Sequence, residues 1–239
     1  MGMHAGESPS MFMQYRALLR KDMEREFHTF DMLSSMVLYA VLVLIVYGVA
    51  LSQVSLGEDV RGVASGLLWV LIVFTSLIGL NRSFAYEREN DCLDAILIAP
   101  IDRSVVFLAK ATSNFLFLAI VELLVTPVFV FFFLEGQQLG ETVQFALAPL
   151  ALGTLGMAAV GTLLATVTTS TRGRDVMLAV LAVPLLFPLL YACVCATSAC
   201  LVGGDGFSSV FVPSVAIIGV YDVVMGLLSW VLYDFVVSA

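Results

Sequence analysis

The chain has 239 residues, of which 60% are hydrophobic and 13% are charged, and its mean hydropathy is +1.01. These values lie far outside the range of soluble globular proteins, so they exclude a water-soluble domain and indicate an integral membrane protein. The net charge of −8 says little about how the chain is oriented in the membrane, because acidic residues contribute little to that orientation. We expect no nucleic acid among the partners.

The first thirty residues predict a helix in the membrane interface rather than a cleaved signal peptide. Four basic residues lie between Arg16 and Arg25, and no apolar segment begins before Leu33. The large apolar side chains recur at helical spacing, at Phe12, Tyr15, Leu19, Met23 and Phe27. This pattern is typical of an amphipathic helix at residues 10–31 on the membrane surface, and it also fits a solvated helical lead-in to the first span.

Six segments are apolar over about the 20 residues that a helix needs to cross a bilayer. They are Leu33–Ser52, Val63–Leu80, Ala111–Leu134, Thr142–Ser170, Val176–Leu201 and Ser214–Val237. They use most of the chain, so residues 1–239 form one membrane domain. Their apolar runs are too long for barrel strands, which alternate over about ten residues. The sequence therefore predicts an all-α integral membrane protein with six transmembrane helices.

The fourth of these segments is rich in small residues, which let helices approach closely. They are Gly153, Gly156, Ala158, Ala159, Gly161 and Ala165. We therefore expect this helix to pack inside the bundle or against a partner subunit.

Basic residues predict the orientation in the membrane. Ten of the eleven lie before the first span or in the second and fourth connections, and only Arg61 lies in the opposite set. Because Lys and Arg are retained on the cytoplasmic side, we expect both termini to be cytoplasmic.

The chain has no P-loop, the nucleotide-binding motif that requires a Gly-Lys pair. Its two lysines, Lys21 and Lys110, follow an arginine and an alanine. Hydrolysis of ATP by that route must take place on another chain, and we expect no catalytic residues in this one.

Histidine and cysteine form no recognisable metal or haem site. The two histidines, His4 and His28, both precede the first span, on the predicted cytoplasmic side. Cys193 and Cys195 form neither a redox CxxC motif nor the CxxCH motif of haem attachment. We therefore expect no metal ligands here, and we interpret these cysteines and Cys200 as small apolar residues, without a further role that the sequence reveals.

Two carboxylates lie within apolar segments, Glu122 in the third and Asp222 in the sixth. A charge at bilayer depth costs about 2.5–3.5 kcal/mol on insertion scales, so each side chain should face the bundle interior or water. Glu122 fits a polar lock to a partner subunit, a hydrogen bond to a neighbour such as Thr126, or a proton relay, and we favour a structural role. Asp222 we expect nearer the outer interface.

The polar segment Asn81–Lys110 separates the second and third spans. Residues 84–89 predict a solvated continuation of the second span, because their charges alternate in sign. Residues 92–99 then form an apolar run that Pro100 ends, as a short helix parallel to the membrane would. Such a helix suits docking of a cytoplasmic partner, and an ordinary interfacial loop is the alternative.

The candidate docking residues comprise charged groups for charge-assisted contacts and apolar groups for a groove on the partner. They are Glu87, Arg88, Glu89, Leu93, Ile96, Leu97, Pro100, Asp102 and Arg103, with Arg172 and Arg174 as a second cytoplasmic contact.

Parts of this sequence resemble a known family. They are Leu80–Phe84, Glu87–Asn90, Ala99–Pro100, Asp102–Arg103 and Leu108–Lys110, with further agreement in Asn114–Pro127 and Thr168–Val176. In these parts the chain resembles the cytochrome c maturation protein B (CcmB) family, the haem exporter permeases of the Ccm system. The resemblance covers nearly the whole chain; it is specific in the two cytoplasmic segments and generic in the spans.

The resemblance implies a transmembrane subunit of an ABC complex in the bacterial inner membrane. The implied partners are the ATPase CcmA, which binds ATP and Mg, the haem-handling protein CcmC and the small CcmD; together they serve the periplasmic haem chaperone CcmE. The subunit would couple ATP hydrolysis to haem handling or export and to release of haem-loaded CcmE, and would bind no cofactor itself. The resemblance leaves open whether haem crosses this subunit and what the stoichiometry is.

Two other functions share these features. A permease of another ABC exporter, for a drug, lipid or polysaccharide, has the same architecture. An ion-coupled carrier would use Glu122 and Asp222, and the small number of charges inside the spans disfavours it.

Overall fold

The computed structural model describes residues 10–52, 60–89, 103–134, 141–168 and 174–238. Within these ranges the chain is helical and has no β-strand. The helices are α1 (Met11–Thr29), α2 (Asp31–Ser52), α3 (Val60–Glu89), α5 (Arg103–Phe133), the 3-10 helix η1 (Glu141–Ala146), α6 (Leu147–Thr168), α7 (Arg174–Val202) and α8 (Phe207–Ser238). The predicted short helix at residues 92–99 lies outside the described residues.

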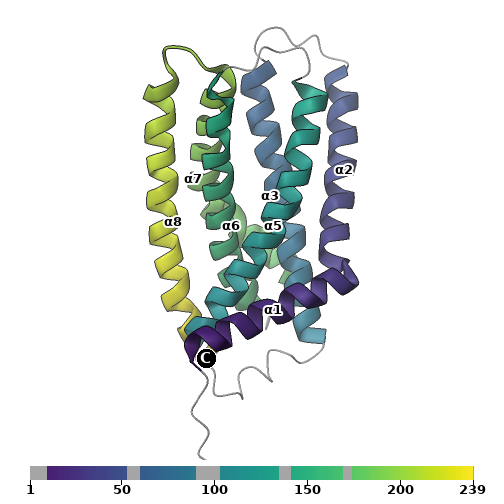
Figure 1. Ribbon diagram of the computed structural model, residues 1–239, viewed down its shortest axis with the longest axis vertical. Coiled ribbons are helices and arrows are strands. Elements are labelled where there is room, and N and C mark those ends of the chain that lie inside the picture. Colours follow the sequence, from purple (N-terminus) through teal and green to yellow (C-terminus); the bar gives the residue numbers. More distant parts are fainter. Residues whose placement is uncertain (1–9, 53–59, 90–102, 135–140, 169–173, 239) are drawn as a thin grey trace, which may run out of the picture.

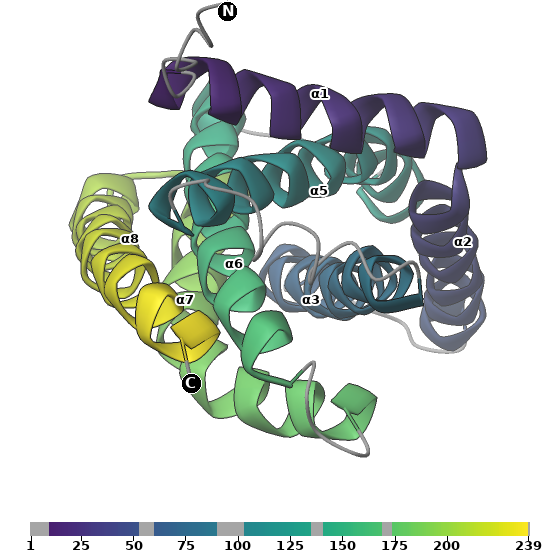
Figure 2. The ribbon, with the colours of Figure 1, turned by 90° about the horizontal axis from the view of Figure 1, so that it is seen from below.

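Six helices are long and apolar enough to cross a membrane, which confirms the predicted fold class. They run roughly parallel and form one bundle (Figure 1). Of the most apolar stretch of each span, 72% of the residues are buried in α6 and 67% in α3, whereas only 11% are buried in α8. The bundle is therefore built around α3 and α6, as the small residues of α6 predicted, and α8 lies at its edge (Figure 2).

The helix α1 lies across one end of the bundle, nearly perpendicular to the spans, and packs along α5 (Figures 1 and 2). It begins after Ser10, whose hydroxyl accepts a hydrogen bond from the Met13 amide, and it ends at Phe30, which has a left-handed φ of 54°. The helix predicted at residues 10–31 is thus confirmed. Its buried residues, however, are Asp22 and Glu26, while Phe12 and Phe27 are exposed.

Most helices begin a few residues before the predicted spans, and α5 and α8 begin furthest ahead of them. The third span was expected from Ala111, but α5 begins at Arg103 and includes Lys110. The reason is that Lys110 is buried against a carboxylate of α1, so its charge does not end the helix. The sixth span was expected from Ser214, but α8 begins at Phe207 and continues through Pro213.

Candidate functional site

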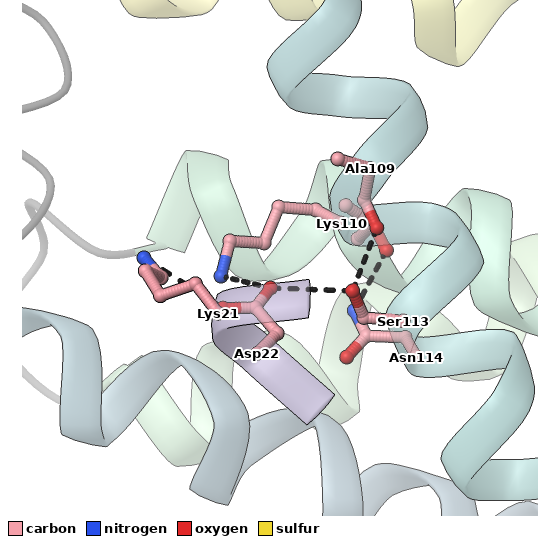
Figure 3. Close-up of polar contacts among 7 residues, drawn as sticks. Lys21, Asp22, Ala109, Lys110, Ser113 and Asn114 are labelled. Atoms are coloured by element: carbon pink, nitrogen blue, oxygen red, sulfur yellow. Dashed lines mark hydrogen bonds and ion pairs between the residues drawn. The ribbon is translucent and has the colours of Figure 1, made fainter. Parts of the chain in front are cut away.

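A buried ion pair fastens α1 to α5. Nζ of Lys110 donates to Oδ2 of Asp22 at 2.9 Å, and the Ser113 hydroxyl donates to the same oxygen at 3.2 Å (Figure 3). Asp22 is 2% exposed and Lys110 is 3% exposed. We call this group, Asp22, Lys110 and Ser113, the α1 anchor.

The anchor holds its carboxyl in the charged form. Burial alone would raise the pKa of Asp22, but the adjacent Lys110 ammonium together with the charges of Lys21 and Arg25 outweighs burial, so the pKa lies below its ordinary value. The Lys21 ammonium, 3.7 Å from Oδ1 of Asp22, acts in the same direction. The pair is therefore a charged contact inside the protein, where breaking one partner is costly.

A second carboxylate joins α1 to the next helix. Oε1 of Glu26 accepts a hydrogen bond of 2.8 Å from the backbone amide of Leu33, in the first turn of α2. The first amides of a helix have no partner within it, so a side-chain oxygen at this position acts as a cap. Asp22 and Glu26 together fix α1 to both of its neighbours.

Polar contacts continue along α5 toward the middle of the bundle. Nδ2 of Asn114 donates to Oγ1 of Thr162 on α6 at 2.9 Å. Two turns further on, the Thr154 hydroxyl on α6 donates to Oε2 of Glu122. α5 is thus bonded to α1 at one end and to α6 at two further levels.

Glu122 forms a lock between helices of this chain. Its bonded neighbour is Thr154 on α6 rather than Thr126, whose hydroxyl is buried without a hydrogen-bond partner among the described residues. Its other oxygen, Oε1, is buried without a hydrogen-bond partner among the described residues, and Glu122 lines a cavity of about 10 Å³ together with Thr75 and Ser76 of α3. The contact joins two helices of this chain, whereas the lock expected from the sequence was to a partner subunit, which stays a prediction.

Asp222 lies near the midpoint of α8, and its expected position nearer the outer interface stays a prediction. Both of its carboxylate oxygens are buried and have no hydrogen-bond partner among the described residues. Its side chain lies against the α6 backbone at Gly156, where a Cβ would collide with the carboxylate.

Asp222 also lines a cavity of about 710 Å³ between α5, α6 and α8, which we call the α8 groove. The lining includes Ala111, Phe115, Gly156, Asp222, Gly226 and Leu227. Thr112 and Asp222 are the polar residues of the lining, so the groove is a largely apolar surface with one hydroxyl and one carboxylate.

Few of the predicted docking residues can be examined directly. Glu87, Arg88 and Glu89 belong to the last turn of α3, so the predicted helical continuation of the second span is confirmed. Arg103 is the first residue of α5 and Arg174 the first of α7. The others lie outside the described residues, namely Leu93, Ile96, Leu97, Pro100, Asp102 and Arg172. ATPase docking stays a prediction.

The cysteines of α7 pack among helices. Cys193 and Cys200 are buried, and the sulfur of Cys193 lies beside the backbone of α6 at Gly153. Among the described residues, no group of three His, Cys, Asp or Glu side chains is arranged to hold a metal ion.

The sequence reasoning missed Asp22, Glu26 and Thr154. Asp22 and Glu26 are four residues apart, so they share one face of α1, and this spacing could have identified them. Thr154 carries no such signal, because the hydroxyl of a threonine in a span usually forms a hydrogen bond with a carbonyl of its own helix. The Thr154 hydroxyl also forms such a bond, with the Leu150 carbonyl.

Comparison with known proteins gives a consistent result. The chain is 29% identical over 134 residues to heme exporter protein B of Rhodobacter capsulatus and 31% identical over 137 residues to that of Paracoccus denitrificans. Each match covers 56% of this chain and 60% of the relative, so the chain spans less than two thirds of these relatives. The heme exporter protein B of Pseudomonas aeruginosa is 25% identical over 148 residues, 59% of this chain and 64% of the relative.

The match to the family as a whole extends further than these pairwise matches. The family model described as CcmB protein covers residues 13–232, from the first turn of α1 to the last turns of α8. Since this range includes most or all of every helix that we describe, the chain belongs to the CcmB protein family.

Proposed function

We propose that this chain is the permease subunit of an ABC complex in cytochrome c maturation, located in the bacterial inner membrane. A CcmA-like ATPase binds ATP and Mg and docks on the connection between α3 and α5, around Glu87–Arg103. Its hydrolysis cycle moves α3 and α5 and thereby acts on haem handling or export and on release of haem-loaded CcmE. The membrane partners in this proposal are CcmC and CcmD.

Three observations support a role as a partner-driven permease. The chain belongs to a family whose matched relatives are named heme exporter protein B, and six of its helices are apolar and long enough to span a membrane. Its sequence has no Gly-Lys pair and hence no P-loop, so the ATPase of such a complex has to be another chain.

The position of α5 is the observation that carries the proposal. This helix begins directly after the proposed docking connection, at Arg103. Within its first six turns it is bonded to α1 through Lys110 and to α6 through Asn114 and Glu122. A displacement of the start of α5 must therefore move or break contacts with two other helices, and packed interfaces of this kind change between discrete arrangements.

Reversing the charges that flank the connection tests the proposal. The double variant Glu87→Arg with Arg103→Glu should lose the ATPase upon co-purification from membranes, since both charge-assisted contacts become repulsive. The membrane domain should keep its elution volume and its thermal unfolding in detergent.

A matched control is available on α1, at the same end of the bundle. Arg20 and Glu24 form an exposed ion pair, which the swap Arg20→Glu with Glu24→Arg retains. This swap should leave the ATPase bound. Undiminished co-purification of the ATPase with the Glu87 and Arg103 double variant would overturn the docking assignment.

A further inference from the structure

The fold makes the exposed surface of α1 more basic than its sequence suggests. Four basic and three acidic residues lie within the helix. Two of the acids, Asp22 and Glu26, are each 2% exposed, because they contact α5 and α2. Glu24 is therefore the one acidic residue on the exposed surface of α1. The exposed basic residues are Arg16, Arg20 and Lys21.

Two of these arginines lie between exposed phenylalanines. Helical spacing of three and four residues places five side chains along one side of the helix, which we call the α1 flank. They are Phe12, Arg16, Arg20, Met23 and Phe27. Phe12 is 71% exposed and Phe27 is 50% exposed, so the flank presents an apolar ring at each end and two guanidinium groups between them.

The α1 flank is directed toward the membrane. Met23, in the middle of the flank, packs against the main buried core of the spans. Leu18, on another side of α1, packs against a cluster that includes Phe107, about one turn of α5 nearer to its start than Lys110. The flank therefore lies on the side of α1 that faces the spans, and Leu18 lies on the side that faces the end of the bundle.

The α1 anchor lies at the depth of the lipid headgroups. The residues from Arg103 to Lys110 extend about 10 Å beyond the anchor, toward the α1 end of the bundle. From Ser113 to Phe133, where α5 ends, the helix spans about 30 Å, which is the thickness of the hydrocarbon core. When Phe133 lies at one boundary of this core, Ser113 and α1 lie at the other, where acyl chains meet headgroups.

A phospholipid with an anionic headgroup fits this flank. Phe12 and Phe27 can insert among acyl chains, while the two arginines reach the phosphates through their long stems. A zwitterionic headgroup balances its phosphate with its own cation, so an anionic lipid gains more from the arginines. Arg20 pairs with Glu24 at the surface, and because such exposed pairs are weak, the guanidinium can exchange this carboxylate for a phosphate.

Other proteins fit the α1 flank less well. A soluble partner approaches from the aqueous phase, whereas this side of the helix faces the membrane. A second copy of this chain would bring the same surface of each copy together, as two-fold symmetric dimers do. Flank against flank would then place arginines against arginines.

We propose that the α1 flank binds anionic phospholipid at the membrane surface, with Arg16 and Arg20 on the headgroup phosphates and Phe12 and Phe27 among the acyl chains. This binding surface is separate from the proposed docking connection Glu87–Arg103, and it stands whether or not an ATPase docks there.

Cross-linking in native membranes identifies the occupant. A photoreactive side chain in place of Phe12 should cross-link to phospholipid, with anionic species enriched over their share of the membrane. The same group in place of Ala17, which is exposed on another side of α1, should give few lipid cross-links. Cross-links from position 12 mainly to protein, or to lipids in proportion to their abundance, would overturn the proposal.

Removing the arginines separates headgroup binding from folding. The full chain carrying the Phe12 cross-linker is placed in nanodiscs of phosphatidylglycerol and phosphatidylcholine in equal amounts. Arg16→Gln with Arg20→Gln should lower the ratio of phosphatidylglycerol to phosphatidylcholine cross-links about tenfold, which corresponds to about 1.4 kcal/mol of binding free energy. Both arginines are exposed, so thermal unfolding of the chain should not change.

A matched control removes two charges elsewhere at the same end of the bundle. Arg103→Gln with Arg174→Gln, at the first residues of α5 and α7, should leave the ratio of cross-links unchanged. Added salt should lower the ratio in the parent chain and have little effect on the Arg16 and Arg20 double variant, because salt screens exposed charges. An equal fall of the ratio in both double variants, or an unchanged ratio in the Arg16 and Arg20 variant, would refute the assignment.

Discussion

A single buried carboxylate on α1 explains why a lysine can lie inside the third span. Lys110 would be costly within an apolar helix, and Asp22 compensates its charge from another helix at 2.9 Å. The Ser113 hydroxyl donates a second hydrogen bond to the same oxygen, Oδ2 of Asp22. The long-range pair thus allows α5 to run through Lys110 as a continuous helix.

The α1 anchor can be tested by breaking and replacing the pair. Lys110→Met alone leaves Asp22 buried without its main cation and should lower the free energy of unfolding by about 3–5 kcal/mol. The double variant Asp22→Leu with Lys110→Met should recover most of this loss, because two apolar side chains of similar size replace the pair. Unfolding by titration with denaturing detergent measures both.

The same pair predicts a dependence on pH. The pKa of Asp22 is lower in the folded protein than in the unfolded chain, so its stabilising contribution is complete above the unfolded pKa of about 3.9 and is lost as the pH falls through the lower folded pKa. Asp22→Asn should abolish this acid-dependent loss, whereas Glu24→Gln, on the exposed side of α1, should retain it. Equal pH profiles for the two variants would contradict the assignment.

At this scale the sequence identified unusual residues but not their partners. Glu122 and Asp222 stand out as carboxylates in apolar segments, and the structure places both inside spans. Their environments differ because of residues far away in the chain, Thr154 for one and Gly156 for the other. Pairings across 30 residues or more depend on how the helices pack, which local patterns do not contain.

The corner between α1 and α2 sets the angle between the surface helix and the bundle. Phe30 adopts a left-handed conformation with its amide bonded to the Glu26 carbonyl at 2.7 Å. The Glu26 side chain crosses the corner to cap α2 at Leu33. One residue therefore ends the first helix with its backbone and begins the second with its carboxylate.

The Glu26 cap can be removed without changing the rest of α1. Glu26→Ala should cost about 0.5–2 kcal/mol, as loss of a helix cap does, and should speed hydrogen exchange at the Leu33 amide. Glu26→Gln keeps an acceptor oxygen and should preserve most of the protection. If the Leu33 amide exchanged at the same rate in the alanine variant, the cap would not be the contact that orders this corner.

Helices were predicted better than their ends. The six spans follow from apolar length alone, and all six are present. α5 and α8 begin earlier than expected. α5 includes Lys110, whose charge is paired with Asp22, and α8 continues through Pro213. The apolar pattern of α1 was recognised, but its inward face was not, since Asp22 and Glu26 are buried by partners on α5 and α2.

Charge is distributed unevenly over the whole molecule. Arg16, Arg20, Lys21 and Arg25 lie on α1, and the starts of α5 and α7, with Arg103 and Arg174, lie at that same end of the bundle (Figure 1). Arg61 lies near the start of α3, at the opposite end. The fold therefore gathers the basic residues at one end of the bundle, which is the arrangement that the positive-inside rule associates with the cytoplasm.

This asymmetry predicts which end of the bundle is accessible from outside the cell membrane. Met11 on α1 and Asp205 between α7 and α8 are exposed and lie at opposite ends. A membrane-impermeant thiol reagent added to spheroplasts should label Asp205→Cys above the level of the parent chain, and should label Met11→Cys only after the membrane is opened. The reverse pattern would place the connection Glu87–Arg103 on the side that lacks ATP. Because an ATPase could not then dock there, this result would refute the orientation and the docking proposal together.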